Sequence, residues 1–195
     1  MNRVSSLAAL ALAAALVLTG CSSSAPTTDT NSGTDSGTVQ EPTVAGATGD
    51  TVTGDGYSYR VPEGWAVPDE DIPGFTPDSV AADMTDTDGF ADNVNVVLSP
   101  AGEVSNDLIE SAGVDELEGA GATEVAVQPR VQVAGAESAH ISARLSQGGT
   151  DYLIEQYYAS HDGQTYVVTF SFSDTVSTGD RTAVAESVLA TWAWA

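Results

Sequence analysis

Carboxylates crowd one short segment of this chain, and they are its most recognisable groups for metal chemistry. Asp86, Asp88 and Asp92 lie close together in the sequence, with Gly89 among them. Calcium takes about six to eight oxygen ligands, many of them from carboxylates. The spacing therefore makes Asp86, Asp88 and Asp92 the best metal-ligand candidates in the chain.

The same segment fits a known calcium-binding loop only in part. Asp86-x-Asp88-Gly89 matches the middle of an EF-hand loop. When Gly89 is aligned with the glycine of that loop, Met84 takes the first ligand position and Asn95 takes the last. Both positions need a carboxylate. We therefore expect a solvated loop between two strands, with no bound metal and no other cofactor.

A second reactive group is the single cysteine, Cys21, which follows an apolar run. That run, from Leu7 to Leu18, has about 12 residues, whereas a membrane-spanning helix needs about 20. The order of these parts predicts a cleaved export signal over 1–20. Leu18-Thr19-Gly20-Cys21 resembles the lipobox of bacterial lipoproteins. The resemblance implies that Cys21 carries a diacylglycerol thioether, whose two acyl chains anchor firmly; the alternative is an ordinary secretory signal with a chance cysteine.

The charge balance excludes nucleic-acid binding. The chain has 28 acidic residues against five basic ones, and its formal net charge is −23. Nucleic-acid binding depends on Lys and Arg contacts to phosphates, so we expect no nucleic-acid partner. An anionic membrane face offers this chain no attraction either, which leaves the lipid on Cys21 as the expected membrane contact.

Three regions of different composition follow one another. After the signal at 1–20, residues 21–55 are rich in Ser, Thr, Gly and Asp and contain no aromatic residue. Such a segment cannot bury enough apolar surface to offset its ordering entropy, so we expect a disordered tether. Apolar periodicity predicts one folded domain over 56–195, which is long enough to bury its own core.

The domain is predicted to consist mainly of antiparallel strands. Ser105 predicts the start of a helix that Gly113 ends, and a second helical turn is expected over 114–117. Ser177 or Thr178 predicts the start of a C-terminal helix. The fold class is therefore α+β, an antiparallel β-sheet with helices packed on it. Strands are expected over 57–61, 65–67, 93–98, 124–128, 130–133, 137–145, 151–160 and 164–173, with a type I′ turn at Asp162-Gly163.

Short motifs within the domain resemble a known family. Val61-Pro62-Glu63-Gly64-Trp65 opens the domain, Asn93-Val94-Asn95-Val96 precedes the predicted helix, and a tyrosine-rich hairpin runs from Tyr157 to Phe170. Over about 56–194 this order resembles the PsbP-like fold and the LpqN-type lipoproteins of actinobacteria that share it. The resemblance implies an α-β-α sandwich that acts as a binding or assembly module and supplies no catalytic residue. We expect Trp65 to fill the core.

Groups suited to catalysis are sparse. His140 is predicted on the polar face of its strand near Arg144, and His161 in an exposed hairpin turn. A zinc site needs about three or four ligands, and the supply here is thin. Asp69-Glu70-Asp71 lies in a proline-flanked loop, where we expect solvated charge and not a catalytic pair. We therefore expect no enzyme.

These observations predict a non-catalytic, lipid-anchored protein on the extracytoplasmic face of the cell membrane. Its partner would be an envelope protein or glycan, and we expect a monomer. One alternative is a carrier of a small ligand or lipid in a cleft between sheet and helix. The other is an envelope hydrolase that uses His140 or His161. We expect the side chains of Tyr152, Tyr157, Tyr158 and Tyr166 to pack in the core. The alternative is that some of them form an exposed aromatic patch that binds peptides or glycans.

Overall fold

The computed structural model describes residues 44–70 and 74–195. Cys21, the signal and most of the predicted tether lie outside the described residues. The boundary predicted at residue 56 is wrong, because β1 (Thr51–Gly54) pairs with β2 (Tyr57–Arg60). Val52 of β1 is buried opposite Tyr59. A single buried valine supports this short edge strand. The prediction missed the strand because it rested on the average composition of residues 21–55, in which one valine has little weight.

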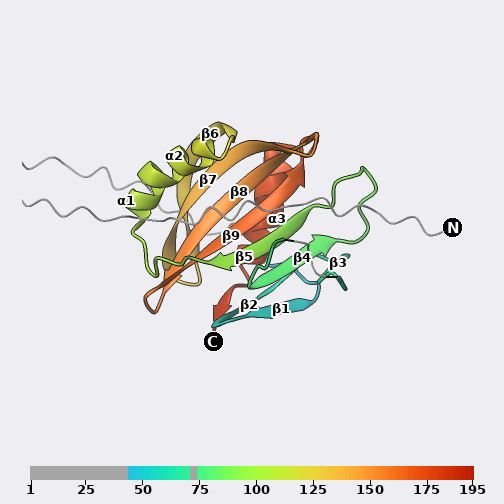
Figure 1. The fold of residues 1–195 in the computed structure, drawn as a ribbon. Helices are drawn as coiled ribbons and strands as arrows, with labels where there is room; N and C mark the ends of the chain where they lie inside the picture. Colours follow the sequence, from blue (N-terminus) through green and yellow to red (C-terminus); the bar gives the residue numbers. More distant parts are fainter. Residues whose placement is uncertain (1–43, 71–73) are drawn as a thin grey trace, which may run out of the picture.

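The centre of the fold is a seven-stranded antiparallel sheet with the strand order β3-β4-β5-β9-β8-β7-β6 (Figure 1). Consecutive strands from β6 to β9 form a meander, since tight turns connect them. Asp162 and Gly163 have φ values of 48° and 82°, as the predicted type I′ turn requires. The strands are Trp65–Ala66 (β3), Ser79–Asp83 (β4), Asn93–Leu98 (β5), Thr123–Val133 (β6), Ala136–Gln147 (β7), Thr150–His161 (β8) and Gln164–Ser173 (β9).

Two strand predictions need correction. The strands expected over 124–128 and 130–133 are one strand, β6, with a register shift between Gln128 and Val131. The bulge allows Pro129 to lie in a strand that pairs on one side only. Strand β4 is not predicted at all, because its small residues show little periodicity.

A small sheet, β1-β2-β10, lies beside the large one, with β10 formed by Ala193–Trp194. Its aromatic side chains pack in the core that Trp65 also fills, as predicted. The ring of Trp192 stacks on Tyr57 at a centroid distance of 4.6 Å and on Tyr59 at 5.3 Å. A two-residue strand has no periodicity to detect, so β10 is absent from the prediction.

Helices cover both faces of the large sheet (Figure 1). One face carries the first helical run, which consists of α1 (Asn106–Leu108), a π-helical turn η1 (Ile109–Gly113) and α2 (Val114–Gly119). The opposite face carries α3 (Thr178–Leu189). The predicted α+β class is confirmed. None of the helices in 44–70 and 74–195 is long and apolar enough to cross a membrane.

The prediction that Gly113 ends its helix is wrong, because the helical run continues through it. A Cβ atom at Gly113 would lie 3.1 Å from Cδ1 of Ile141 on β7. The glycine therefore permits close packing of the run on the sheet and does not act as a stop. Ser105 precedes α1 as expected but makes no capping hydrogen bond with its side chain, whereas Ser177 caps α3 by accepting from the Asp180 amide.

The large sheet buries side chains on both faces. The β7 residues Ala139 and Ile141 pack against the first helical run, and Val168 and Phe170 of β9 pack against α3. The four tyrosines at 152, 157, 158 and 166 are all buried, so the expected core packing is confirmed.

Candidate functional site

Strand register places three side chains in one row on the α3 face of the sheet. Gln128 on β6 lies opposite His140 on β7, and His140 lies opposite Tyr157 on β8. Directly opposed residues of antiparallel strands project to the same face. The imidazole of His140 stacks on the Tyr157 ring at a centroid distance of 4.1 Å. His140 lies on the face of β7 that was predicted to be polar. That face is covered by other elements, and His140 is only 7% exposed.

The buried carboxylate of Glu155 on β8 holds His140 in place. Its Oε2 lies 2.9 Å from Nε2 of His140, and its Oε1 accepts a hydrogen bond from Nε of Arg181 at 3.0 Å. A carboxylate paired with arginine can only accept hydrogen bonds. Nε2 of His140 therefore donates this hydrogen bond.

Arg181 fixes this cluster to the start of α3. Its guanidinium also donates to the carbonyl oxygen of Val176 at 2.9 Å. The side chains of Arg181 and Glu155 are 10% and 3% exposed. Burial of two charges is tolerated when they are paired and their remaining hydrogen-bonding groups are satisfied. The cluster formed by Glu155, His140 and Arg181 is called the buried triad below.

A pocket of about 110 Å³ opens beside the triad, between the edge strand β6 and helix α3. Drug-sized ligands occupy pockets of roughly 300 Å³ or more. This pocket has room for the end of a side chain or a small head group, but not for an acyl chain. Its lining residues are Gln128, Pro129, Val131, His140, Tyr157, Thr182 and Glu186.

The polar lining of the pocket contains both hydrogen-bond donors and acceptors, since Tyr157 and Thr182 contribute hydroxyl groups. Glu186 contributes a carboxylate and His140 an imidazole edge. The amide nitrogen of Gln128 donates to Oγ of Ser142 at 2.9 Å, which leaves the amide oxygen as its other polar end. Burial raises the pKa of Tyr157, and the carboxylates of Glu155 and Glu186 raise it further. The phenol therefore keeps its proton at neutral pH.

The His140–Glu155 pair has the form of a general base with its orienting carboxylate. A nucleophile would have to lie within about 2.6–3.2 Å of the histidine. Within the described part of the chain, the side-chain hydrogen bond of His140 goes to Glu155. Among these residues no hydroxyl is hydrogen-bonded to the imidazole.

The three candidate metal ligands lie in the loop between β4 and β5, where two accept hydrogen bonds from the loop's own backbone and the third from the backbone of β9. Oδ1 of Asp86 accepts from the amide of Asp88, and Oδ1 of Asp88 accepts from the amide of Phe90. Oδ1 of Asp92 accepts from the amide of Ser173 at 2.8 Å. Across 44–70 and 74–195 no three His, Cys, Asp or Glu side chains are arranged to hold a metal ion.

Asp92 is the unusual member of this loop. Burial raises its pKa to about 6, against an opposing hydrogen bond from Ser173, and the nearby carboxylates add to the increase. His161 is the last residue of β8, paired with Gln164, and not part of the turn as predicted. It is partly buried, stacks on Trp194 at 4.6 Å and does not line the pocket. Cys21 lies outside the described residues.

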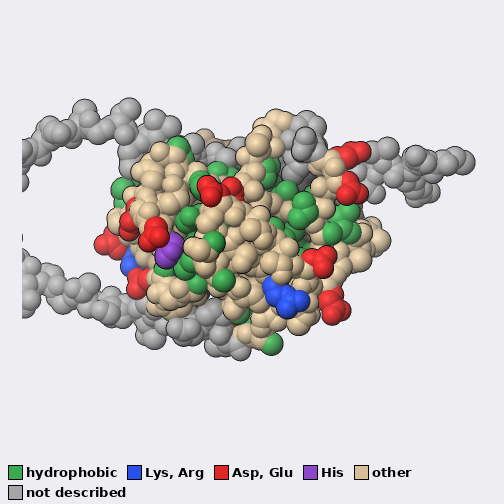
Figure 2. Space-filling view, turned by 90° about the horizontal axis from the view of Figure 1, so that it is seen from below, with side chains coloured by type: hydrophobic (Ala, Val, Ile, Leu, Met, Phe, Trp, Pro, Cys, Tyr) green, Lys and Arg blue, Asp and Glu red, His purple; other side chains and the backbone are tan. Residues whose placement is uncertain are grey.

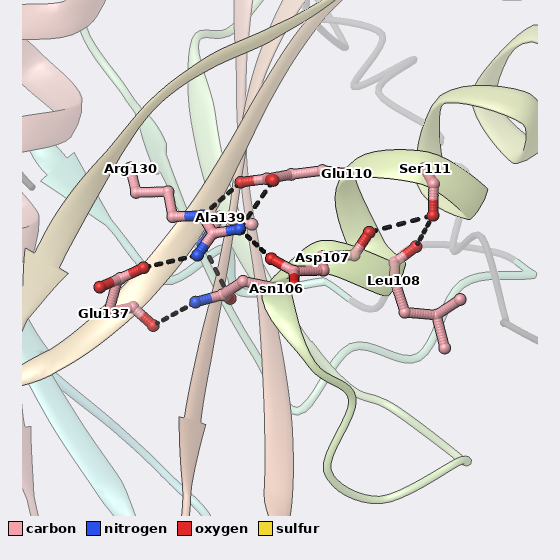
Figure 3. Close-up of polar contacts among 8 residues, drawn as sticks. All are labelled: Asn106, Asp107, Leu108, Glu110, Ser111, Arg130, Glu137 and Ala139. Carbon is pink, nitrogen blue, oxygen red and sulfur yellow. Dashed lines mark hydrogen bonds and ion pairs between the residues drawn. The ribbon is translucent and has the colours of Figure 1, made fainter. Parts of the chain in front are cut away.

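A second arginine cluster lies on the opposite face of the sheet (Figure 3). Arg130 donates to Glu137 at 2.7 Å, to Glu110 at 2.8 Å and to Asp107. Asn106 joins the same region by donating to the Glu137 carbonyl. These contacts fasten the first helical run to β6 and β7. The group formed by Arg130 and its three carboxylates is called the surface network below.

Comparison with known proteins identifies the fold. No protein-family model and no curated protein matches the chain. The crystal structure of LpqN from Mycobacterium tuberculosis matches with a TM-score of 0.51 and 13% identity, over 75% of this chain and 85% of LpqN. The solution structure of cyanobacterial PsbP from Synechocystis matches with a TM-score of 0.50 and 16% identity, over 72% of this chain and 88% of that one. The fold is PsbP-like.

A third structure, from Bacteroides thetaiotaomicron, is similar over 75% of this chain with 15% identity and a TM-score of 0.45. This chain spans only 48% of that protein. The predicted resemblance of the PsbP-like domain is therefore confirmed, by the first two structures, at the level of the fold.

Sequence reasoning missed most of the pocket of this PsbP-like domain. It singled out His140 but not Glu155, Arg181 or Glu186. One signal was available, because Glu155 is a charge inside the otherwise uncharged strand segment 152–160. A carboxylate at such a position needs a cation, and the chain has only five basic residues to supply one.

Proposed function

We propose that this chain is a lipoprotein, anchored through Cys21 to the extracytoplasmic face of the cell membrane. Its PsbP-like domain would act as a non-catalytic binding or assembly module of the cell envelope. The observation that carries the proposal is the fold shared with LpqN, which is involved in cell envelope biogenesis. The lipobox motif ending at Cys21 supports the same location.

The distribution of charge supports a binding role with a basic partner. Arginines 130, 144 and 181 pair with carboxylates of the same chain, and Arg60 donates to the carbonyls of Thr48 and Gly49. The four arginines of the described residues are thus engaged within the fold, while acidic side chains are in excess. Figure 2 shows these acidic side chains scattered over one face and not gathered in one patch. Such a surface steers cationic partners and repels anionic ones.

The anchor is tested by metabolic labelling with an alkyne fatty acid in the native host. We expect the wild-type chain to be labelled and to fractionate with membranes. Cys21→Ala should abolish the label and release the chain, whereas Ser24→Ala should leave both unchanged. A Cys21→Ala chain that stays labelled would contradict the proposal.

The binding role is tested by chemical cross-linking of the anchored chain in intact cells. We expect this chain to capture a defined envelope protein. The control is an unrelated lipoprotein with the same signal and anchor, which should not capture that protein. Enrichment of the same proteins by both chains would count against a specific partner.

A further inference from the structure

We propose that the pocket between β6 and α3 binds the carboxamide group of an asparagine or glutamine side chain from a partner protein. This inference deepens the proposed binding role and rests on it, because it names the surface and the chemistry by which the module would recognise its partner. The observation that carries it is a hydroxyl group in the pocket wall that has no hydrogen-bond partner within the described residues.

That hydroxyl belongs to Tyr157, which differs in this respect from other buried tyrosines. The Tyr57 hydroxyl donates to the carboxylate of Asp78, and the Tyr158 hydroxyl donates to the amide oxygen of Gln156. Tyr157 is only 1% exposed, yet within 44–70 and 74–195 its hydroxyl forms no hydrogen bond. Buried polar groups are normally hydrogen-bonded, so this exception indicates a missing partner.

The Tyr157 hydroxyl faces the pocket. Among the described residues, two side-chain atoms are fully enclosed without a hydrogen-bond partner, Oε1 of Gln147 and Nε1 of Trp192. The Tyr157 hydroxyl is not one of them and therefore remains accessible, and the space that Tyr157 lines is the pocket. Because burial raises the pKa of Tyr157, the hydroxyl keeps its proton. A ligand in the pocket must therefore offer an acceptor to this O–H group.

Neighbouring rings hold the Tyr157 side chain in place. The imidazole of His140 stacks on its ring at a centroid distance of 4.1 Å, and the ring of Phe170 packs edge-on at 5.9 Å. Glu155 fixes His140 in turn. A donor that is already positioned loses little conformational entropy when a ligand binds, which favours binding at this point.

Gln128 supplies the complementary acceptor. Its amide nitrogen donates to Oγ of Ser142 at 2.9 Å, which leaves the amide oxygen to accept a hydrogen bond. Thr182 adds a hydroxyl that both donates and accepts. An uncharged group with both properties matches this lining. A primary carboxamide accepts from Tyr157 through its carbonyl oxygen and donates to Gln128 through its N–H groups.

Charged groups match the lining less well. Ammonium and guanidinium groups carry donors only, so the Tyr157 O–H group would still lack an acceptor. A carboxylate has no donor for the Gln128 oxygen, and it would approach a chain whose formal net charge is −23. Burial of either charge costs far more than burial of an amide. Glu186 lines the same pocket but already has another interaction, and the proposed contact does not use it.

The size and position of the pocket match the end of an amide side chain. Its volume of about 110 Å³ accepts a carboxamide group and a short aliphatic stem, and Pro129 and Val131 provide apolar wall for that stem. Strand β6 is the last strand of its sheet. A partner segment therefore reaches the pocket from the edge of the sheet without displacing α3.

The test uses the full chain in detergent micelles and follows amide signals by NMR. The probe is butyramide, which carries the carboxamide and stem of a glutamine side chain. Controls of similar size are 2-pentanone, which only accepts, n-butylammonium, which only donates, and the anion butyrate. We expect butyramide to shift the signals of Gln128, Val131 and Thr182 saturably. The ketone should bind at least about fivefold more weakly, and the two ions should shift none of these signals.

A further ligand distinguishes a protein side chain from a glycan. N-acetylglucosamine carries a secondary amide on a sugar ring, which is bulkier than the end of a side chain. We expect it to bind more weakly than butyramide, because the pocket of about 110 Å³ is matched to the smaller group.

Two variants of matched chemistry locate the binding. Tyr157→Phe removes only the hydroxyl, and we expect it to weaken butyramide binding at least about fivefold. The urea midpoint of unfolding should stay unchanged or rise, because no hydrogen bond within the fold is lost. Tyr158→Phe removes a hydroxyl on the opposite face of the sheet, which donates to Gln156. It should lower the midpoint and leave butyramide affinity within about twofold of the wild type.

The proposal is overturned if butyramide gives no saturable shifts, or if Tyr157→Phe binds butyramide like the wild type. It is also overturned if 2-pentanone binds equally well, or if either ion or N-acetylglucosamine binds more tightly than butyramide. Each of these results would leave acylation at Cys21 and capture of an envelope partner intact. Failure of the proposed function would give the reverse pattern, with probe binding but no acyl label and no specific partner.

Discussion

The two faces of the large sheet use arginine and carboxylates in different surroundings. On the α3 face, Arg181 and Glu155 are 10% and 3% exposed and form a balanced pair. On the opposite face, Arg130 is 27% exposed and serves three carboxylates, of which Asp107 is 89% exposed. Buried charge must be matched, whereas exposed charge can remain in excess because water screens it. The matched pair holds His140 beside a pocket, and the surface network fastens a helical run.

The largest effect is expected from Arg181→Met. This change leaves Glu155 buried without its cation, and such a loss costs about 3–5 kcal/mol of unfolding free energy. Urea denaturation of the variant measures it. The double variant Glu155→Gln/Arg181→Met removes both charges and should recover most of the loss. A single variant within about 1 kcal/mol of the wild type would mean that the pair is not desolvated.

Packing of the first helical run is tested at Gly113. Gly113→Ala places a methyl group 3.1 Å from Cδ1 of Ile141, and we expect a loss of about 1–2 kcal/mol in unfolding free energy. Gly119→Ala is the matched control, because a Cβ there meets nothing within 4 Å. The control should gain up to about 1 kcal/mol from helix propensity. Urea denaturation compares the two variants, and equal gains at both positions would contradict the close contact with β7.

The surface network should contribute less than the buried pair. Arg130→Met is expected to cost about 1 kcal/mol, since the partners are partly or largely exposed. The cost should shrink further in about 1 M salt, where the screening length is only about 3 Å. Urea denaturation at low and high salt measures both values. A cost above that of Arg181→Met would reverse the comparison between the faces.

The smallest effect is a pH dependence at Asp92. Burial raises its pKa from 3.8 to about 6, so the folded chain keeps a proton that the unfolded chain has released. Asp92 should therefore lower stability as the pH rises from about 4 to about 6. The side chain is only half-buried, and solvent screening limits the change to about 1 kcal/mol or less. Asp92→Asn should flatten the stability profile over this range relative to wild type.

Much of the fold could be predicted from local patterns. The strands that became β7, β8 and β9 alternate clearly, and the Asp162-Gly163 turn fixes the pairing of the last two. Gly113 misled the prediction, because its close approach to Ile141 depends on a contact distant in sequence. Strand β10 has only two residues, and β1 buries one side chain, so neither shows a period.

The candidate site was harder to predict because it depends on register. His140 meets Tyr157 and Gln128 only after three strands pair, and Arg181 reaches Glu155 only after α3 packs on the sheet. No spacing along the chain encodes these contacts. The acidic loop, by contrast, is local in sequence and easily recognised, yet its carboxylates bind backbone amides.

We propose that the α3 face of the sheet is the binding face and that the opposite face is scaffold. Ala126 and Val127 are adjacent, exposed residues of β6, and they pair with Ser142 and Ile141, which project to opposite faces. A photo-cross-linking amino acid placed at either position in intact cells compares the two faces directly. We predict that position 126 captures a defined envelope protein and that position 127 does not. Equal capture from both positions would contradict this assignment of the two faces.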